Sequence, residues 1–347
     1  MNNKISRRAL LAAGAGLMAG AAALTSSRAG ALPDAGHPDY LAPWSPPENV
    51  RRDLTPGPTA IRLASAGHRL SNIDGNPAEQ VERIRNQGYT AAEAAYTNWR
   101  EMSDSEIREL KAALRQYDLQ FYTVHISDNI IHPDPQRRAA VHRSYLEAIG
   151  MADQMGMDFI VAHTGWRSSG SPYAHRENWT QETWEMSVDA LRQVLADSSG
   201  SRVKLAVEAV NSTNFNTPAA HARLRDDLAS DRLGFTLDPT NMIHAGSLFR
   251  NTELINECFD LLGEDILYAH AKDIRWAEML PGLEWVVPGQ GEMDYEVYLT
   301  HLSRMAYPRP LMMEFLNRGD YQGEDQYPQA KRFIEDTAAR LGVTIYS

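Results

Sequence analysis

Short apolar segments alternate with longer amphipathic segments along most of the chain. Eight apolar or β-branched runs have the length of buried strands, at residues 60–66, 89–96, 120–126, 158–163, 203–210, 233–237, 266–270 and 310–315. Apolar residues at helical spacing predict helices between them, at residues 77–87, 106–116, 136–155, 181–196, 252–262, 295–305 and 330–341. Ser103 and Glu106 have the spacing of a helix capping box, which supports the helix at 106–116.

This alternation predicts an α/β fold, a single (β/α)8 TIM barrel over residues 59–347. Strand starts recur at intervals of roughly 30 to 45 residues, which is the length of a βα unit. A doubly wound open sheet is the alternative, but it requires a glycine-rich first turn of the form G-x-G-x-x-G. Residues 65–69 read S-A-G-H-R instead. In a barrel, catalytic residues lie at the C-terminal ends of the strands.

The N-terminal residues predict a removable leader followed by an extended arm. Residues 1–31 carry four basic residues, no acidic residue, an apolar run at 9–24 and an A-x-A site at the end, as in a signal peptide. The S-R-R-A-L-L sequence at 6–11 is similar to a twin-arginine motif, so we expect export to the periplasm. The run is shorter than the roughly 20 residues of a membrane anchor. Residues 32–58 contain seven prolines and predict an extended arm lying on the barrel.

The net charge and the cysteine content limit the partners and metal sites that this protein can have. The chain has 34 Lys and Arg against 45 Asp and Glu, a net charge of −11, which argues against nucleic acid as a partner. Cys258 is the only cysteine, which excludes an internal disulfide and a cysteine-based zinc site. A metal in this protein must therefore be held by histidine and carboxylate side chains.

Four consecutive predicted strands each carry one polar residue that is suited to bind metal. These residues are Glu208, Asp238, His270 and Glu314. Any one of them is explained by a turn, a cap or an ion pair, but burying carboxylates in apolar strands is costly without a partner or a metal. Three carboxylates and one imidazole favour one divalent ion with oxygen preference, Mn²⁺, Mg²⁺ or Co²⁺, with Zn²⁺ as a less suited alternative.

Such a site predicts removal of a proton next to a carbonyl. A divalent ion can polarise a carbonyl and hold the neighbouring hydroxyl, which stabilises a metal-bound enediolate. Glu208 and Glu314 face each other in this arrangement and are the candidates for the catalytic base and acid.

Further side chains near the predicted mouth are candidates for substrate binding. His125 and His163 end the third and fourth strands, Trp166 follows the fourth, and Lys272 and Arg275 follow the seventh. A lone histidine is more often a structural hydrogen-bonding residue, but two at strand ends suit contacts with sugar hydroxyls or proton donation. The tryptophan suits stacking against a sugar ring.

Several short motifs carry a resemblance to a known family. Residues 237–241 read L-D-P-T-N, residues 270–273 read H-A-K-D, and residues 289–294 read G-Q-G-E-M-D. Together with Glu208 and Glu314, their order resembles the xylose isomerase-like TIM barrel superfamily, also called the sugar phosphate isomerase/epimerase family. The resemblance implies an endonuclease-IV-like barrel with a divalent metal, most often manganese, bound by Glu208, Asp238, His270 and Glu314.

The family contains several activities. Its members include ketose epimerases, hydroxypyruvate isomerase, inosose dehydratases and proteins that cleave 3-oxo-glycosides. Ketose 3-epimerases have a histidine and an arginine at the positions of Asn241 and Trp276 here, whereas Arg275 lies one position earlier.

We therefore expect a metal-dependent sugar isomerase or epimerase-like enzyme acting on a keto sugar. The alternatives are a lyase that cleaves 3-oxo-glycosides by β-elimination at the same metal site, and an exported carbohydrate-binding protein. The expected partner is a small-molecule carbohydrate, and homo-oligomer formation is left open.

Overall fold

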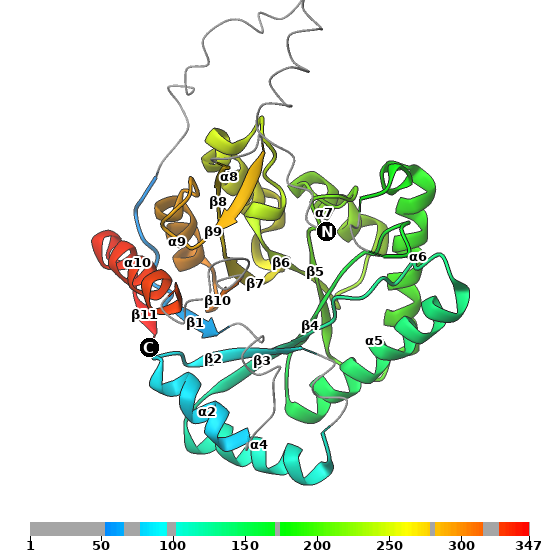
Figure 1. Ribbon diagram of the computed structural model, residues 1–347, viewed down its shortest axis with the longest axis horizontal. Coiled ribbons are helices and arrows are strands. Elements are labelled where there is room, and N and C mark those ends of the chain that lie inside the picture. The colour runs from blue at the N-terminus through cyan, green and yellow to red at the C-terminus, as the bar shows by residue number, and fades with distance from the viewer. Residues whose placement is uncertain are drawn as a thin grey trace, which may run out of the picture. The chain divides into compact units, whose positions relative to one another are not determined.

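Eight parallel strands form one closed sheet in the computed structural model, which describes residues 53–65, 77–95, 102–170, 174–277, 282–314 and 326–346 (Figure 1). The strands are β1 (Ile61–Ser65), β2 (Ala91–Ala95), β3 (Gln120–His125), β4 (Phe159–Ala162), β5 (Lys204–Glu208), β6 (Leu233–Leu237), β7 (Ile266–Ala271) and β10 (Pro310–Met313). Strand β10 pairs with both β7 and β1, which closes the barrel. The prediction of a (β/α)8 TIM barrel is confirmed.

Helices between the strands form the outer layer (Figure 1). They are α2 (Pro77–Asn86), α4 (Asp104–Gln116), α5 (Pro135–Met155), α6 (Gln181–Asp197), α7 (Pro218–Leu228), α8 (Asn251–Leu262), α9 (Tyr295–Arg304) and α10 (Gln326–Leu341). Short 3₁₀ turns occur at η2 (Arg176–Trp179), η3 (Pro239–Asn241), η4 (Leu248–Arg250) and η5 (Gly263–Asp265). Ser103 and Glu106 form the expected capping box at the start of α4.

The apolar strand runs explain how the barrel is filled. All residues of β4 and β6 are buried, as expected for parallel strands that are covered on both faces. Helix α7 was not predicted, because only Leu224 and Leu228 supply large aliphatic side chains on its buried face, which also holds Pro218 and His221. Thr217 caps its start by accepting a hydrogen bond from the Ala220 amide.

Two further pairings were not predicted. Strands β8 (Asp273–Trp276) and β9 (Leu283–Val286) form an antiparallel hairpin after β7, and β11 (Ile345–Tyr346) adds to β1. Strands β8 and β9 have four residues each and β11 has two, which is too short for a period-2 pattern to identify them with certainty.

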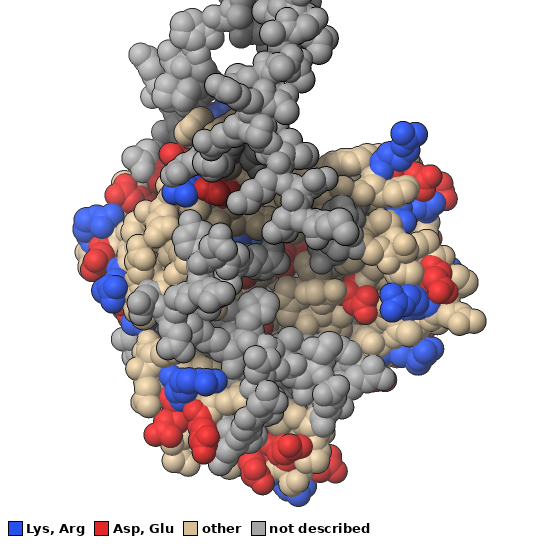
Figure 2. Space-filling view, in the orientation of Figure 1, with Lys and Arg blue, Asp and Glu red and all other residues tan. Residues whose placement is uncertain are grey.

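The end of the predicted arm lies along α9. The Gly57 amide donates to Ser303 Oγ at 2.9 Å, and Arg304 Nε donates to the Thr55 carbonyl at 2.9 Å. The predicted signal peptide and most of the arm fall at residues 1–52, outside the described residues. Among the helices that are described, none is both long and apolar enough to span a bilayer. On the face shown in Figure 2, acidic and basic side chains are interspersed around the periphery.

The buried side chain of His221 on α7 makes the stability of the folded protein depend on pH. The ring is fully buried against Phe235, and its Nδ1 lies 2.8 Å from the Thr217 carbonyl. Burial lowers the pKa of His221 to about 4, although the hydrogen bond to Thr217 opposes the shift. The unfolded chain takes up a proton near pH 6.5, before the folded protein does, so His221 reduces stability as the pH falls from 6.5 to 4.

We expect a His221→Gln variant to lose less stability on acidification than the wild type. In the wild type, the buried His221 lowers the free energy of unfolding by an amount that approaches about 1.4 kcal/mol for each pH unit below pH 6.5, and the variant lacks this loss. Urea unfolding at several pH values between 6.5 and 4.5 measures this difference. Other titrating groups are common to both proteins and cancel, so parallel stability curves would contradict the prediction.

Candidate metal centre and active site

Four strand ends bring Glu208, Asp238, His270 and Glu314 together. His270 Nδ1 lies 3.3 Å from Glu208 Oε1, 3.8 Å from Asp238 Oδ2 and 3.0 Å from Glu314 Oε2. One potential ligand atom from each residue lies within 4.8 Å of the others, and all four side chains are buried. Parallel strands of a closed barrel place their C-terminal ends on one face, so residues distant in sequence meet there.

The donor atoms of this cluster fit a divalent cation. Glu208 Oε2, Asp238 Oδ2, Glu314 Oε2 and both ring nitrogens of His270 are buried and receive no hydrogen bond within the described part of the chain. Several of these atoms take part in ion-pair contacts. Burying a polar atom without a hydrogen bond nevertheless reduces the stability of the folded state. A cation bound by the three carboxylates and the imidazole would satisfy them.

The turn after β6 orients Asp238. Its Oδ1 accepts hydrogen bonds from the Thr240 amide at 3.0 Å and the Thr240 hydroxyl at 2.7 Å. Asp238 Oδ2 accepts neither of these hydrogen bonds and lies near His270. Tyr298 on α9 donates its hydroxyl to the carbonyls of Leu237 and His270, which ties the ends of β6 and β7 together.

The charges within the cluster favour a cation. Burial alone would lower the pKa of His270, but the carboxylates of Glu208 and Glu314 raise it well above its usual value. Burial would raise the pKa of Glu208, but His270 outweighs it and lowers the pKa. The pKa of Asp238 is lowered as well, because the attraction of Lys272 and His270 exceeds the effect of burial. Glu208 and Asp238 are therefore ionised at neutral pH.

Lys272 and Asn241 lie at the edge of this cluster. Lys272 Nζ is 2.5 Å from Asp238 Oδ2 and 3.0 Å from Glu314 Oε2, and it donates to Asn241 Oδ1 at 3.1 Å. Asn241 Nδ2 in turn donates to Glu208 Oε1 at 3.0 Å. Asn241 thus connects Lys272 to a candidate catalytic carboxylate.

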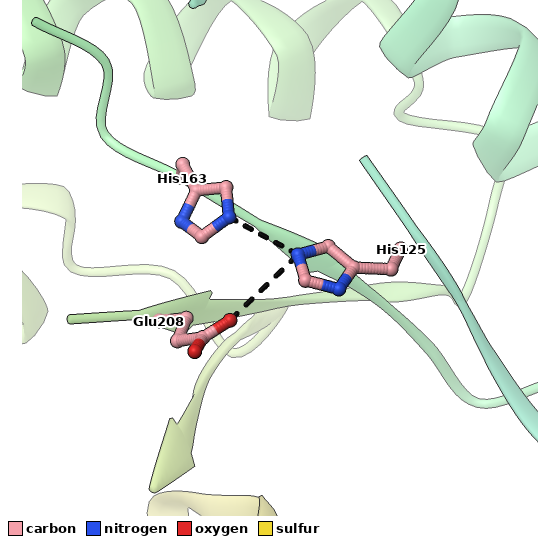
Figure 3. A group of neighbouring side chains, drawn as sticks. All are labelled: His125, His163 and Glu208. Atoms are coloured by element: carbon pink, nitrogen blue, oxygen red, sulfur yellow. Dashed lines mark hydrogen bonds and ion pairs between the residues drawn. The ribbon is translucent and has the colours of Figure 1, made fainter. Parts of the chain in front are cut away.

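His125 and His163 adjoin Glu208 on its other side (Figure 3). His125 Nε2 lies 3.1 Å from His163 Nε2 and 3.7 Å from Glu208 Oε2. His125 Nδ1 lies 3.5 Å from Glu93 Oε1 on β2. Burial lowers the pKa of His163 to about 4, whereas Glu93 more than offsets burial and raises the pKa of His125. The structure therefore brings both predicted histidines to the site.

The other two predicted substrate contacts are placed differently. Arg275 pairs with Glu284 across the β8–β9 hairpin at 2.7 Å, on the face opposite to Ile274 and Trp285. Trp166 is buried, and its backbone exchanges two hydrogen bonds with the side chain of Asn129. Their roles in substrate binding stay predictions.

Asp273 anchors the hairpin beside the site. Its carboxylate accepts backbone hydrogen bonds from Ile274, Gly289, Gly291 and Met293, at 2.8 to 3.0 Å. A Cβ at Gly291 would lie 2.3 Å from Asp273 Oδ1, so only glycine permits this approach. The G-Q-G segment is thus a tight turn, and Asp294, three residues after Gly291, caps α9.

Comparison with known proteins gives the family. A sequence model of the family described as xylose isomerase-like TIM barrel matches residues 81–337. The chain therefore belongs to the xylose isomerase-like TIM barrel family.

Solved structures show the same fold. D-psicose 3-epimerase with D-tagatose from Clostridium cellulolyticum H10 has a TM-score of 0.62 and 16% identity, covering 82% of this chain and 100% of that one. A xylose isomerase-like TIM barrel protein from Mycobacterium smegmatis in complex with magnesium has a TM-score of 0.60 and 13% identity, covering 81% and 97%. The IOLI protein with a bound zinc atom has a TM-score of 0.60 and 16% identity, covering 81% and 98%.

Proposed function

We propose that this protein is a divalent-metal-dependent sugar isomerase or epimerase-like enzyme that removes the proton next to the carbonyl of a keto sugar or sugar derivative. The observation that carries the proposal is the convergence of Glu208, Asp238, His270 and Glu314, with buried donor atoms that receive no hydrogen bond within the described chain. Similarity to an epimerase structure that contains D-tagatose supports a carbohydrate substrate.

These four residues would hold one divalent ion. The oxygen-rich set supports Mn²⁺, with Mg²⁺, Co²⁺ or Zn²⁺ as alternatives, and relatives of the same fold contain magnesium or zinc. The bound ion would act as a Lewis acid toward the substrate carbonyl, which lowers the free-energy cost of removing the neighbouring proton.

Glu208 is suited to accept that proton. Asn241 orients its Oε1, and its Oε2 lies toward His125 without a hydrogen bond among the residues that are described. The substrate C–H bond breaks as an O–H bond forms on this carboxylate, and Glu314 supplies the proton that the product needs. Return to the opposite face of the same carbon gives an epimer, and transfer to the adjoining carbon gives an isomer.

The surrounding cations and imidazoles would position the substrate oxygens. Lys272 is a fixed positive charge within 3.0 Å of Glu314, where it can stabilise negative charge that develops on a substrate oxygen. His125 and His163 offer ring nitrogens to sugar hydroxyls on the Glu208 side. We further propose that the enzyme acts after export, since residues 1–31 carry the sequence of a leader.

Hydrogen exchange in D₂O tests this function. Manganese-loaded protein is incubated with a panel of keto sugars and 3-oxo-glycosides, and deuterium at the carbon next to the carbonyl is followed by NMR. We expect incorporation together with an isomerised or epimerised sugar, and no incorporation after the metal is removed by a chelator. Exchange with release of the substituent would identify the lyase alternative instead. Sugar binding without exchange on the whole panel would show a binding protein and contradict the proposal.

A further inference from the structure

The β8–β9 hairpin follows strand β7 in the chain (Figure 1). Lys272, which contacts Asp238 and Glu314, is the residue that immediately precedes β8. The carboxylate of Asp273, the first residue of β8, accepts hydrogen bonds from the backbone amides of both glycines of the G-Q-G turn. The hairpin therefore has a defined position relative to the candidate ligands.

One face of this hairpin carries two tryptophans. The antiparallel register pairs Ile274 with Trp285 and Trp276 with Leu283. Side chains of directly paired residues share a face, and residues two positions apart on a strand also do, so Trp276 and Trp285 lie on the same face. Arg275 and its partner Glu284 occupy the opposite face.

This aromatic face begins at the metal centre and extends to solvent. Lys272 Nζ lies 4.9 Å from the centroid of the Trp285 ring, and the same Nζ lies 3.0 Å from Glu314 Oε2. Trp285 is 37% exposed and Trp276 is 46% exposed, whereas Ile274, the cross-strand partner of Trp285, is buried. The two indoles thus offer apolar area next to a strongly polar site, an arrangement that suits an amphipathic ligand.

We propose that Trp285 and Trp276 form an aromatic shelf that binds the second ring of a glycoside whose keto-sugar ring occupies the metal centre. The proposal rests on the function proposed above and names its substrate class. A keto-sugar ring held by the carboxylates would lie next to Lys272, whose Nζ is 4.9 Å from the Trp285 ring, so a ring attached to that sugar would extend along this face of the hairpin. The C–H face of a sugar ring, or the face of an aryl group, packs well on an indole.

The shelf would also serve the lyase alternative named above, in which the attached ring is the leaving group. In a 3-oxo-glycoside, the carbon that bears the attached ring's oxygen is β to the carbonyl. Removal of the proton at C2 by a carboxylate places an electron pair that forms the C1–C2 double bond and breaks the C1–O bond. The departing oxygen takes up a proton, which gives an unsaturated keto sugar and the free alcohol, with no change of oxidation state overall.

Binding of two glucosides tests the shelf without requiring turnover. Manganese-loaded protein is titrated with methyl β-D-glucoside and with phenyl β-D-glucoside by calorimetry. We expect the phenyl compound to bind about two- to tenfold more tightly, since one aromatic contact contributes on that order. Trp285→Leu is expected to abolish this preference, Trp276→Leu to reduce it, and Trp285→Phe to keep most of it.

Trp179 provides the matched control. It is 55% exposed and lines a separate surface pocket with Trp184 and Arg223, near the N-terminal ends of α6 and α7. Trp179→Leu should leave the preference unchanged. Absence of phenyl β-D-glucoside binding to the wild type, equal binding of both glucosides, or an equal loss in Trp179→Leu would each overturn the shelf. Deuterium exchange in the same protein sample reports separately on the proposed function.

Discussion

Replacing Glu208 or Glu314 with glutamine is expected to lower turnover by about 10² to 10⁴-fold while the protein retains most of its metal. Loss of a general base or acid typically has an effect of this size. The amide keeps an oxygen near the cation but cannot accept or deliver the proton. Glu208→Gln also keeps an acceptor oxygen near Asn241, so the local structure should persist.

Rates at saturating manganese separate the chemical effect from the loss of a charged ligand. Metal content is measured on the same samples by elemental analysis. Glu335→Gln is the matched control, because this carboxylate pairs with Lys331 on α10 and has no part in the cluster. If both site variants keep near-normal turnover under these conditions, neither carboxylate carries the proton, and His125, His163 or Lys272 must do so.

Asp238→Ala and His270→Ala are each expected to abolish stoichiometric metal binding. The wild type should contain about one divalent ion per chain, held by four residues. Removing one ligand leaves an incomplete set and unbalanced buried charge, which weakens the remaining contacts. Because the metal stabilises only the folded state, a chelator should lower the melting temperature of the wild type by about 4 °C for metal at 100 times its Kd.

The variants themselves should show almost no response to the chelator. Asp265→Ala makes the same replacement at a surface residue that pairs with Arg225, and His142→Ala does so at a partly exposed histidine that pairs with Asp197. Both controls should keep the metal and the chelator response. Full metal content in Asp238→Ala and His270→Ala would show that the ion is bound elsewhere.

Much of the barrel was predictable because its signals are local. Strand β6 reads as a mainly apolar run that is followed by Asp238, and β5 has three apolar residues that are followed by Glu208. A polar residue at the end of a buried run is conspicuous against its neighbours, and parallel strand ends share one face of a barrel. The contacts among Glu208, Asp238, His270 and Glu314 therefore follow expectations drawn from sequence.

The connecting elements lacked such signals. Helix α7 has too few large apolar residues on its buried face, and strands β8 and β9 have only four residues each. Trp285 was not predicted as a site residue, since the four-residue strand that carries it was itself not predicted. Its proximity to Lys272 arises only when the hairpin folds back on the end of β7.

By itself, the sequence of this protein determined the barrel, the acidic balance, and which four strand ends carry the histidine and carboxylate side chains proposed as ligands. Only the tertiary structure decided which side chains surround those ligands. It placed Asn241 between Lys272 and Glu208, set His125 against His163, and turned Arg275 toward Glu284. The physical reason is that the formation of a strand depends on residues next to each other in the sequence. These contacts instead join residues from different strands and loops, whose distances are set by the packing of the whole barrel.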